Sequence, residues 1–215
     1  MNSSTRILAI RHGETAWNVD TRIQGHLDIP LNDTGLQQAR HLGRTLAARD
    51  SLDAIYASDL SRAHTTASAI AQATGQTVTA DPGLRERHFG EFQGRTFAEI
   101  EAELPDHAWH WRKRTPDWVP PGGGESLLML RERIVGTVNA LAARHPGQQI
   151  VLVAHGGVMD ILYRAATRLD LQAPRTWPLT NTAVNRLLWT PQGLSLVGWG
   201  DTSHLDSLGQ DETTL

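Results

Sequence analysis

Residues 6–15, RILAIRHGET, and residues 149–157, QIVLVAHGG, share one pattern: a short apolar run that ends in a histidine followed by glycine. Runs of this length and composition are typical of buried β-strands. In open α/β sheets, ligands bind at the carboxyl ends of strands, where glycine lets the backbone approach them closely. If the two strands are neighbours, His12 and His155 face one crevice. The pattern therefore predicts a ligand site built around two imidazoles.

The rest of the chain alternates apolar runs with helical patterns, which is typical of α/β proteins. Further strands are expected at residues 52–57 and 77–80, and a hairpin at residues 183–189 and 194–199. Apolar spacing and capping residues predict four helices: from Asp33-Thr34 through Leu46, from Ser58 or Asp59 to Gly75, over residues 127–141, and from Gly156 onward. Together these elements predict an α/β fold, a three-layer α/β/α sandwich with a mostly parallel central sheet.

Residues 83–124 interrupt this alternation with prolines, tryptophans and a basic run at residues 112–114. Thr96 and Glu99 form a capping-box pattern for one short helix, and the remainder is interpreted as an irregular cover over the sheet edge or a cleft. The basic run is expected to be a solvated face, with attraction of an anionic substrate as the alternative. Three aromatic side chains are expected to be packing residues of the cover: Trp109, Trp111 and Trp118.

No internal repeat or linker divides the chain, so we expect one domain over residues 1–206. Residues 83–124 are interpreted as an insert within it. The polar residues 207–215 are expected to be a mobile tail.

The composition narrows the classes of function. The 215 residues include no cysteine, which excludes disulfides, thiolate zinc sites and a cysteine nucleophile. A net charge of −3 argues against a nucleic-acid partner. No signal peptide or apolar segment of spanning length is evident, so no membrane partner is expected and the cytoplasm is the default location. The histidines show no metal-ligand spacing, and neither a metal nor another cofactor is expected.

Residues 11–15, RHGET, are the first of several motifs along the chain. Together these motifs resemble those of the histidine phosphatase superfamily, the phosphoglycerate mutase-like family. The resemblance covers nearly the whole chain and is strongest to its small bacterial broad-specificity phosphatase branch. It rests on these segments: Arg11-His12-Gly13-Glu14-Thr15 with Trp17-Asn18, Gln24-Gly25, Asp28-Ile29-Pro30-Leu31, Ser58-Asp59-Leu60-Ser61-Arg62-Ala63, Leu84-Arg85-Glu86, Gly124-Glu125-Ser126, Ala154-His155-Gly156 and Asp201-Thr202-Ser203-His204-Leu205.

The resemblance implies a phosphatase that hydrolyses phosphate monoesters of small metabolites through a phosphohistidine on His12. A neutral imidazole is a good nucleophile if one ring nitrogen is free while the other donates to a carbonyl or other acceptor. Arg11 and Arg62 suit the phosphoryl oxygens because guanidinium groups bind them in a forked geometry. His155, if protonated, adds a donor. Glu86 is expected to protonate the leaving oxygen and then to deprotonate the attacking water.

The same resemblance implies a set of residues that contact the substrate. They are Arg11, Asn18, Gln24, Arg62, Glu86, His155 and Gly156. From the local sequence alone, Glu86 could instead be a surface carboxylate paired with Arg85 or Arg87. The expected partners are a small phosphorylated metabolite and a phosphate or other oxyanion in the pocket, with a homodimer through edge strands left open.

Other functions remain open at this stage. The short interval between Glu86 and His155 resembles the phosphatases, because cofactor-dependent phosphoglycerate mutases carry a longer insert there. The sequence of the acid motif, Glu86-Arg87-His88-Phe89-Gly90, is closer to that of those mutases. A dedicated α-ribazole phosphatase, a phosphoprotein phosphatase and a non-catalytic phosphate-binding module are further alternatives. The last is disfavoured because all five expected catalytic positions are filled.

Overall fold

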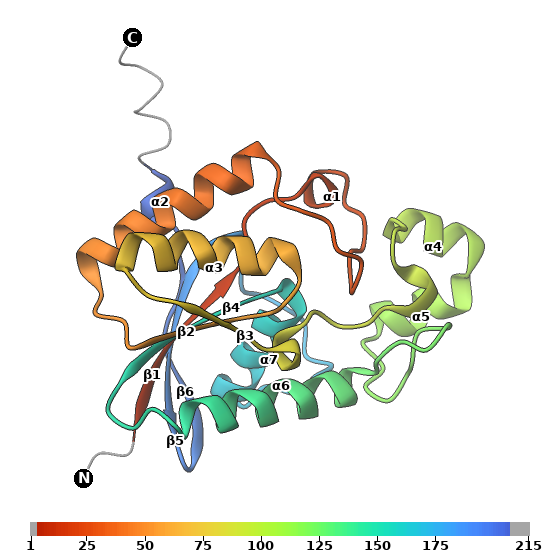
Figure 1. The fold of residues 1–215 in the computed structure, drawn as a ribbon. Coiled ribbons are helices and arrows are strands. Elements are labelled where there is room, and N and C mark those ends of the chain that lie inside the picture. The colour runs from red at the N-terminus through yellow and green to blue at the C-terminus, as the bar shows by residue number, and fades with distance from the viewer. Residues whose placement is uncertain (1–3, 207–215) are drawn as a thin grey trace.

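The computed structural model describes residues 4–206, so the tail expected at residues 207–215 lies outside the described residues. Within the described residues, six strands form one sheet in the order β3-β2-β4-β1-β5-β6. Their bounds are β1 Thr5–Arg11, β2 Ala54–Ala57, β3 Val78–Ala80, β4 Gln149–Ala154, β5 Val184–Thr190 and β6 Gly193–Asp201. Strands β3, β2, β4 and β1 pair in parallel, and the β5–β6 hairpin joins β1 antiparallel (Figure 1). The mostly parallel sheet is thus confirmed.

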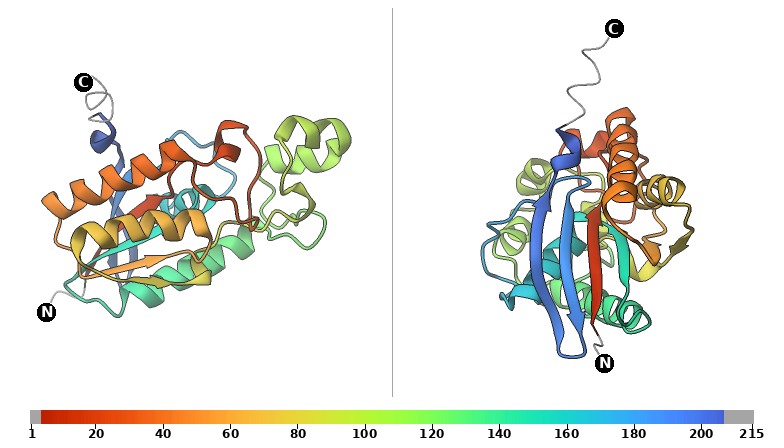
Figure 2. Two further views of the ribbon diagram at one scale, coloured as in Figure 1. Left: turned by 45° about the horizontal axis from the view of Figure 1, so that its top comes forward. Right: turned by 90° about the vertical axis from the view of Figure 1, so that its left-hand side faces the viewer.

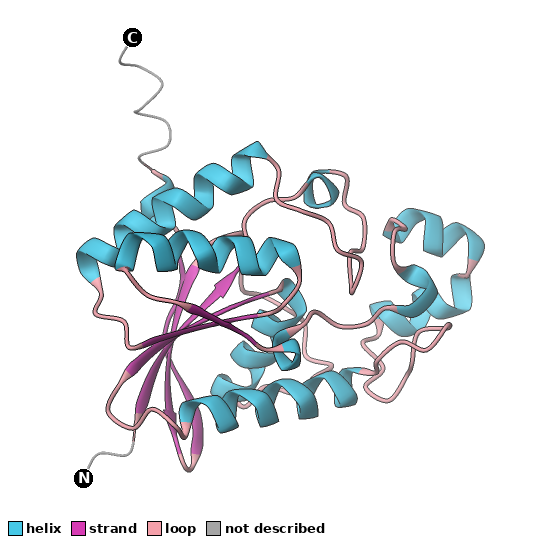
Figure 3. Ribbon diagram, viewed as in Figure 1, coloured by secondary structure: helices cyan, strands magenta, loops and turns pink. Residues whose placement is uncertain are grey.

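Helices cover both faces of the sheet, as a three-layer sandwich requires (Figures 1 and 3). The four long helices are α2 Asp33–Arg49, α3 Ser61–Thr74, α6 Leu127–Ala142 and α7 Gly156–Thr167. Successive side chains of a strand point to opposite faces, so Leu8 and Ile10 pack with α2 and α3, whereas Ile7 and Ala9 pack with α6 and α7. Every residue of β4 is buried, because this central strand is covered on both sides.

Two helix starts differ from the sequence-based expectation. Helix α2 is capped by Asn32, one residue before the predicted pair, and its side chain accepts a hydrogen bond from the backbone N–H of Gly35 at 2.8 Å. Helix α3 begins at Ser61 without a side-chain cap, because its N-cap residue is Leu60 rather than Ser58 or Asp59. Asp59 forms an ion pair with Arg85 at 2.6 Å instead. The predicted end of α3 is confirmed, with Gly75 at a left-handed φ of 70°.

Residues 83–124 are more regular than expected. They contain α4 Phe97–Glu103, with the predicted capping box at Thr96, and also α5 Pro105–Arg112, which the sequence did not predict. These helices project to one side of the sheet (Figures 1 and 2). They enclose a separate apolar cluster centred on Phe92, Ile100 and Ala108, against which Trp111 and Trp118 pack. The segment therefore has its own small core.

Short elements complete the described chain: α1 Ala16–Val19, η1 Pro82–Leu84, η2 Gly90–Phe92 and η3 Ser203–Leu205. Between residues 4 and 206, no helix is both long enough and apolar enough to cross a membrane.

Two leucines of α6 test the layer arrangement. Leu141 is fully buried against the sheet, whereas Leu128 is 47% exposed. We expect Leu141→Ala to lower the free energy of unfolding by roughly 2–5 kcal/mol, since it removes buried apolar contacts and leaves a cavity. Leu128→Ala, the matched control, should change it by about 0.5 kcal/mol or less. Urea unfolding of both variants measures the difference, and equal effects would contradict the placement of α6.

Candidate active site

The pairing of β1 with β4 brings the two sequence-predicted histidines together. The strands run parallel in a register that aligns Arg11 with Ala154, and the backbone N–H of His12 donates to the carbonyl of Ala154 at 2.9 Å. The next residue on each strand is therefore a histidine at the same sheet edge. The ring centroids of His12 and His155 lie 5.2 Å apart, so both imidazoles belong to one site.

The ring of His12 is oriented by its own loop. Its Nδ1 atom lies 2.7 Å from the carbonyl oxygen of Gly13, a distance at which Nδ1 donates a hydrogen bond. The donated hydrogen fixes the neutral tautomer, which leaves Nε2 with a free lone pair. Asn181 holds the same turn, because its amide group donates to the carbonyl of His12 at 2.8 Å. The structure thus presents a neutral imidazole with one nitrogen available for attack.

Several buried nitrogen atoms around His12 have no hydrogen-bond partner. They are Nε of Arg11, Nε of Arg62, and both ring nitrogens of His155. The Nη atoms of Arg62 are held by the carbonyls of Leu27 and Gly25, at 2.9 and 2.8 Å. Buried donors are nearly always paired in folded proteins, and leaving them unpaired is costly. Because the guanidinium groups of Arg11 and Arg62 are cationic, this cluster of unpaired nitrogen atoms beside His12 is a preformed anion site.

A cavity with a volume of about 170 Å³ lies beside His12. Its lining includes Asn18 and Gln24, two further residues that were predicted to contact the substrate. Asn18 uses its side-chain oxygen to accept from the backbone N–H of Thr15 at 3.1 Å, which leaves its NH₂ group as the donor for a ligand. Gln24 is buried, and its side-chain oxygen has no partner. The lining also includes Arg11, Arg62, Glu86 and Gly156, so six of the seven residues predicted to contact substrate meet here. The seventh, His155, is fully buried and is not part of the lining.

Glu86 lies at this cavity and is held by backbone groups. Its Oε1 accepts from the N–H of Arg87 at 2.7 Å, and its Oε2 accepts from the N–H of Gly157 at 2.9 Å. A Cβ added at Gly157 would lie 2.2 Å from Oε1, so glycine is required for this approach. The alternative pairing with Arg85 is wrong, since Arg85 pairs with Asp59. The carboxylate therefore faces the site.

Arg133 and Glu125 hold the loop that carries Glu86. The guanidinium of Arg133 donates to the carbonyls of Gly83, Arg85 and Glu86 at 2.9, 2.9 and 3.1 Å. It also binds both oxygens of Glu125 at 2.7 Å. Glu125 was predicted only as a motif residue and Arg133 was not predicted, because the carbonyls that Arg133 binds are about fifty positions away. This bidentate pair fixes the loop geometrically.

Burial and the two arginines govern the protonation of the site. Burial, with Arg11 and Arg62 beside it, holds the pKa of His12 well below the usual histidine range. The pKa of His155 is likewise lowered well below that range, by burial and then by Arg62, His12 and Arg11. Burial also lowers the pKa of Arg62, to about 10, so that this guanidinium remains charged at neutral pH. The site therefore holds two neutral imidazoles and fixed positive charge.

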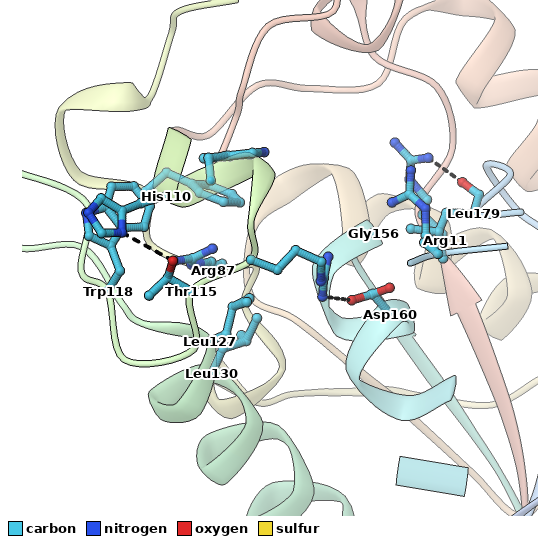
Figure 4. A pocket seen from close by; sticks show the side chains of 15 residues that line it. Arg11, Arg87, His110, Thr115, Trp118, Leu127, Leu130, Gly156, Asp160 and Leu179 are labelled. Atoms are coloured by element: carbon cyan, nitrogen blue, oxygen red, sulfur yellow. Dashed lines mark hydrogen bonds and ion pairs between the residues drawn. The ribbon is translucent and has the colours of Figure 1, made fainter. Parts of the chain in front are cut away.

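A second cavity has a volume of about 500 Å³, and Figure 4 shows the residues that line it. The two share Arg11, Phe89, Trp111 and Gly156 in their linings. In Figure 4, Arg11 and Gly156 lie at one side of the larger cavity, and His110 and Trp118 lie at the other. The larger lining also carries positive charge, on Arg87, Arg114 and Arg175. Of these, only Arg114 belongs to the run for which attraction of an anionic substrate was the alternative prediction.

The prediction that residues 112–114 form a solvated face is wrong for Arg114. Arg112 is exposed and pairs with Glu101, as such a face would. Arg114 turns inward instead, donates to Asp160 at 2.6 Å, and adopts a left-handed φ of 50°. A positive φ is uncommon for a residue other than glycine, and no local sequence pattern predicted it here.

The donor set suits an oxyanion rather than a metal ion. The guanidinium groups of Arg11 and Arg62 have no lone pair to offer and cannot ligate a cation. Across residues 4–206, no group of three His, Cys, Asp or Glu side chains is arranged to hold a metal ion.

Comparison with known proteins agrees with this geometry. Residues 7–202 match the family model of the histidine phosphatase superfamily (branch 1). The chain belongs to the histidine phosphatase superfamily. Within it, the chain is a phosphoric monoester hydrolase, because its similar relatives include named phosphatases.

Two relatives from Arabidopsis thaliana illustrate the range of names. The chain is 39% identical to phosphoglycerate mutase-like protein 4, over 94% of this chain and 88% of the relative. It is 36% identical to a metal-independent phosphoserine phosphatase, over 95% and 85%. Among solved structures, a mycobacterial glucosyl-3-phosphoglycerate phosphatase in complex with VO3 superimposes with a TM-score of 0.81 at 33% identity, covering 92% of this chain and 99% of that one.

The protonation of the two rings can be measured directly. Because both pKa values are lowered, we expect His12 and His155 to stay neutral as the pH falls through 6.5, the usual histidine value. Nitrogen NMR of the histidine rings, assigned with His12→Ala and His155→Ala, reports this. The unfolded chain binds these protons and the folded chain does not, so the free energy of unfolding should decrease as the pH falls below 6.5. Protonation of both rings near pH 6.5 would contradict the buried site.

Proposed function

We propose that this phosphatase hydrolyses phosphate monoesters of small metabolites through a phosphohistidine formed on Nε2 of His12. The observation that carries the proposal is the ring of buried, unpartnered donors around a neutral His12, with the carboxylate of Glu86 beside it. Phosphoryl transfer needs chiefly positioning and stabilisation of charge on the phosphoryl oxygens. Arg11, Arg62 and His155 supply both.

The proposed reaction has two steps. The first step begins with the carboxyl group of Glu86 protonated. Nε2 of His12 attacks phosphorus, the bond to the leaving oxygen breaks, and Glu86 gives that oxygen its proton. In the second, Glu86 takes a proton from water, the water oxygen attacks the phosphohistidine, and inorganic phosphate is released. His12 and Glu86 return to their starting protonation states, so the cycle needs no cofactor.

A mutase is the second candidate, because one relative carries the name phosphoglycerate mutase-like protein and others are named probable phosphoglycerate mutases. A mutase returns the phosphoryl group to a second hydroxyl instead of to water. The two are separated by following 3-phosphoglycerate with a trace of bisphosphoglycerate by phosphorus NMR. Isomerisation faster than phosphate release would overturn the preference for hydrolysis.

His12 provides the first test of the mechanism. The parent protein should hydrolyse p-nitrophenyl phosphate in the presence of EDTA, because no metal takes part. His12→Ala should lose at least about 1,000-fold in kcat, since the nucleophile is removed. Quenching the parent with alkaline detergent during turnover should trap a phosphoryl group that is stable to base and labile to acid. Activity that disappears with EDTA would contradict the proposal.

Glu86 provides a separate test through the leaving group. An alkoxide needs a proton to depart, whereas p-nitrophenolate does not. We expect Glu86→Gln to lower kcat/KM for an alkyl phosphate by about 100-fold or more, and that for p-nitrophenyl phosphate much less. Asp59→Asn, a matched change of an exposed carboxylate, should leave the ratio of the two unchanged. Equal losses on both substrates in Glu86→Gln would exclude Glu86 as the acid.

A further inference from the structure

The segment of residues 25–27 holds the guanidinium of Arg62 from two sides. The carbonyls of Gly25 and Leu27 accept hydrogen bonds from its two Nη atoms, at 2.8 and 2.9 Å. The residue between these two carbonyls is His26. Arg62 and Glu86 both line the smaller cavity, so this segment fixes the cation that the proposed mechanism places on the phosphoryl oxygens.

The ring of His26 reaches from this segment to the loop that carries Glu86. Its Nε2 atom lies 2.7 Å from the carbonyl oxygen of Glu86, which is a normal length for a hydrogen bond. A carbonyl oxygen can only accept, so Nε2 carries the hydrogen and donates it. One side chain thus joins the backbone that holds Arg62 to the backbone of Glu86.

Neighbouring residues fix the position of His26. Its backbone N–H donates to the side-chain oxygen of Gln93 at 2.7 Å. The ring of His88 meets that of His26 edge to face, with the ring centroids 4.8 Å apart. Gly25 has a left-handed φ of 53°, and a Cβ added there would lie 2.2 Å from the Gln93 oxygen, so this close approach requires glycine. The ring is therefore held in one orientation towards the Glu86 loop.

The surroundings of His26 indicate a role other than contact with substrate. His26 is not part of the lining of either cavity. Burial lowers its pKa, so the ring is neutral at neutral pH and adds no charge to the site. Arg133 also donates to the carbonyl of Glu86, at 3.1 Å, but it ties that carbonyl to helix α6. The contribution specific to His26 is the link between Glu86 and the segment that holds Arg62.

From this link we infer that His26 is a positioning residue, which sets the distance between Arg62 and the carboxyl group of Glu86. Arg62 locates the phosphorus atom, and Glu86 must then lie within hydrogen-bond reach of the leaving oxygen. A displacement of about 1 Å can lower a rate on the order of 100-fold. The inference rests on the proposed function and deepens it, because it assigns the alignment of acid and phosphoryl group to one side chain.

Two substitutions of His26 test the inference. His26→Phe keeps a planar ring but removes the donor, whereas His26→Gln keeps an N–H group that can reach the same carbonyl. We expect the ratio of kcat/KM for an alkyl phosphate to kcat/KM for p-nitrophenyl phosphate to fall about 10-fold in His26→Phe, because only the alkoxide needs a proton to leave. His26→Gln should restore most of the parent ratio.

His145→Phe is the matched control. His145 is also half-buried and also forms a hydrogen bond through Nε2, to the hydroxyl of Tyr56 at 2.8 Å. It precedes β4, at the end of that strand away from the site, so the ratio should be unchanged in this variant. Equal losses on the two substrates in His26→Phe, no loss at all, or a His26→Gln variant as impaired as His26→Phe would each overturn the inference.

A double variant shows whether His26 acts through Glu86. His26→Phe combined with Glu86→Gln should hydrolyse the alkyl phosphate no more slowly than Glu86→Gln alone, because the acid that His26 positions is already absent. Losses that multiply would show that His26 acts through another group, such as Arg62, and would overturn the inference.

The outcomes separate this inference from the proposed function. If Glu86→Gln shows the expected dependence on the leaving group and His26→Phe does not, the function stands and the inference fails. If p-nitrophenyl phosphate is not hydrolysed, or Glu86→Gln shows no such dependence, the proposed function fails. Crystal structures of the parent and both His26 variants then decide the positioning without activity. The distance between the Glu86 carboxyl and the Arg62 guanidinium should change in His26→Phe and be kept in His26→Gln, and any other pattern would overturn the inference.

Discussion

The parallel pairing of β1 with β4 is the constraint on which the site depends. Its register aligns the last residue of each strand, so the following histidines emerge side by side at one sheet edge. A slip of one residue would turn the side chains of one strand to the opposite face. The two apolar faces of these strands pack against different helix layers, so such a slip would also expose core residues. The same burial that stabilises the sheet therefore specifies the catalytic geometry.

Much of this arrangement could be predicted from local sequence, because it follows from patterns that local physics creates. Uninterrupted apolar runs marked the buried central strands, and the repeated His-Gly step marked the strand ends where ligands bind. The orientation of His12 through a carbonyl acceptor also followed from what a nucleophilic imidazole requires. These features depend on residues that are neighbours in the chain or belong to regular elements.

The features that were not predicted depend on contacts between distant parts of the chain. Helix α5 was missed because its apolar side is made of only Ala108 and Trp111, which pack with Phe92 in a core that exists only in the folded segment. Arg133 acts on carbonyls near Glu86, and Arg114 reaches Asp160 from a left-handed backbone conformation. In each case the partner is far away in sequence, and no spacing rule connects the two.

The separate apolar core of residues 83–124 has a consequence for how such an enzyme changes over time. Phe92, Ile100 and Ala108 stabilise the cover without contributing to the two clusters that hold the sheet and its helices. Substitutions in the cover can then reshape the wall formed by Trp111 and Trp118 while the phosphoryl-binding groups stay in place. Selection for a new metabolite can therefore act on residues 83–124, because their packing is largely independent of the residues that bind the phosphoryl group. One reactive centre can in this way be paired with many specificities.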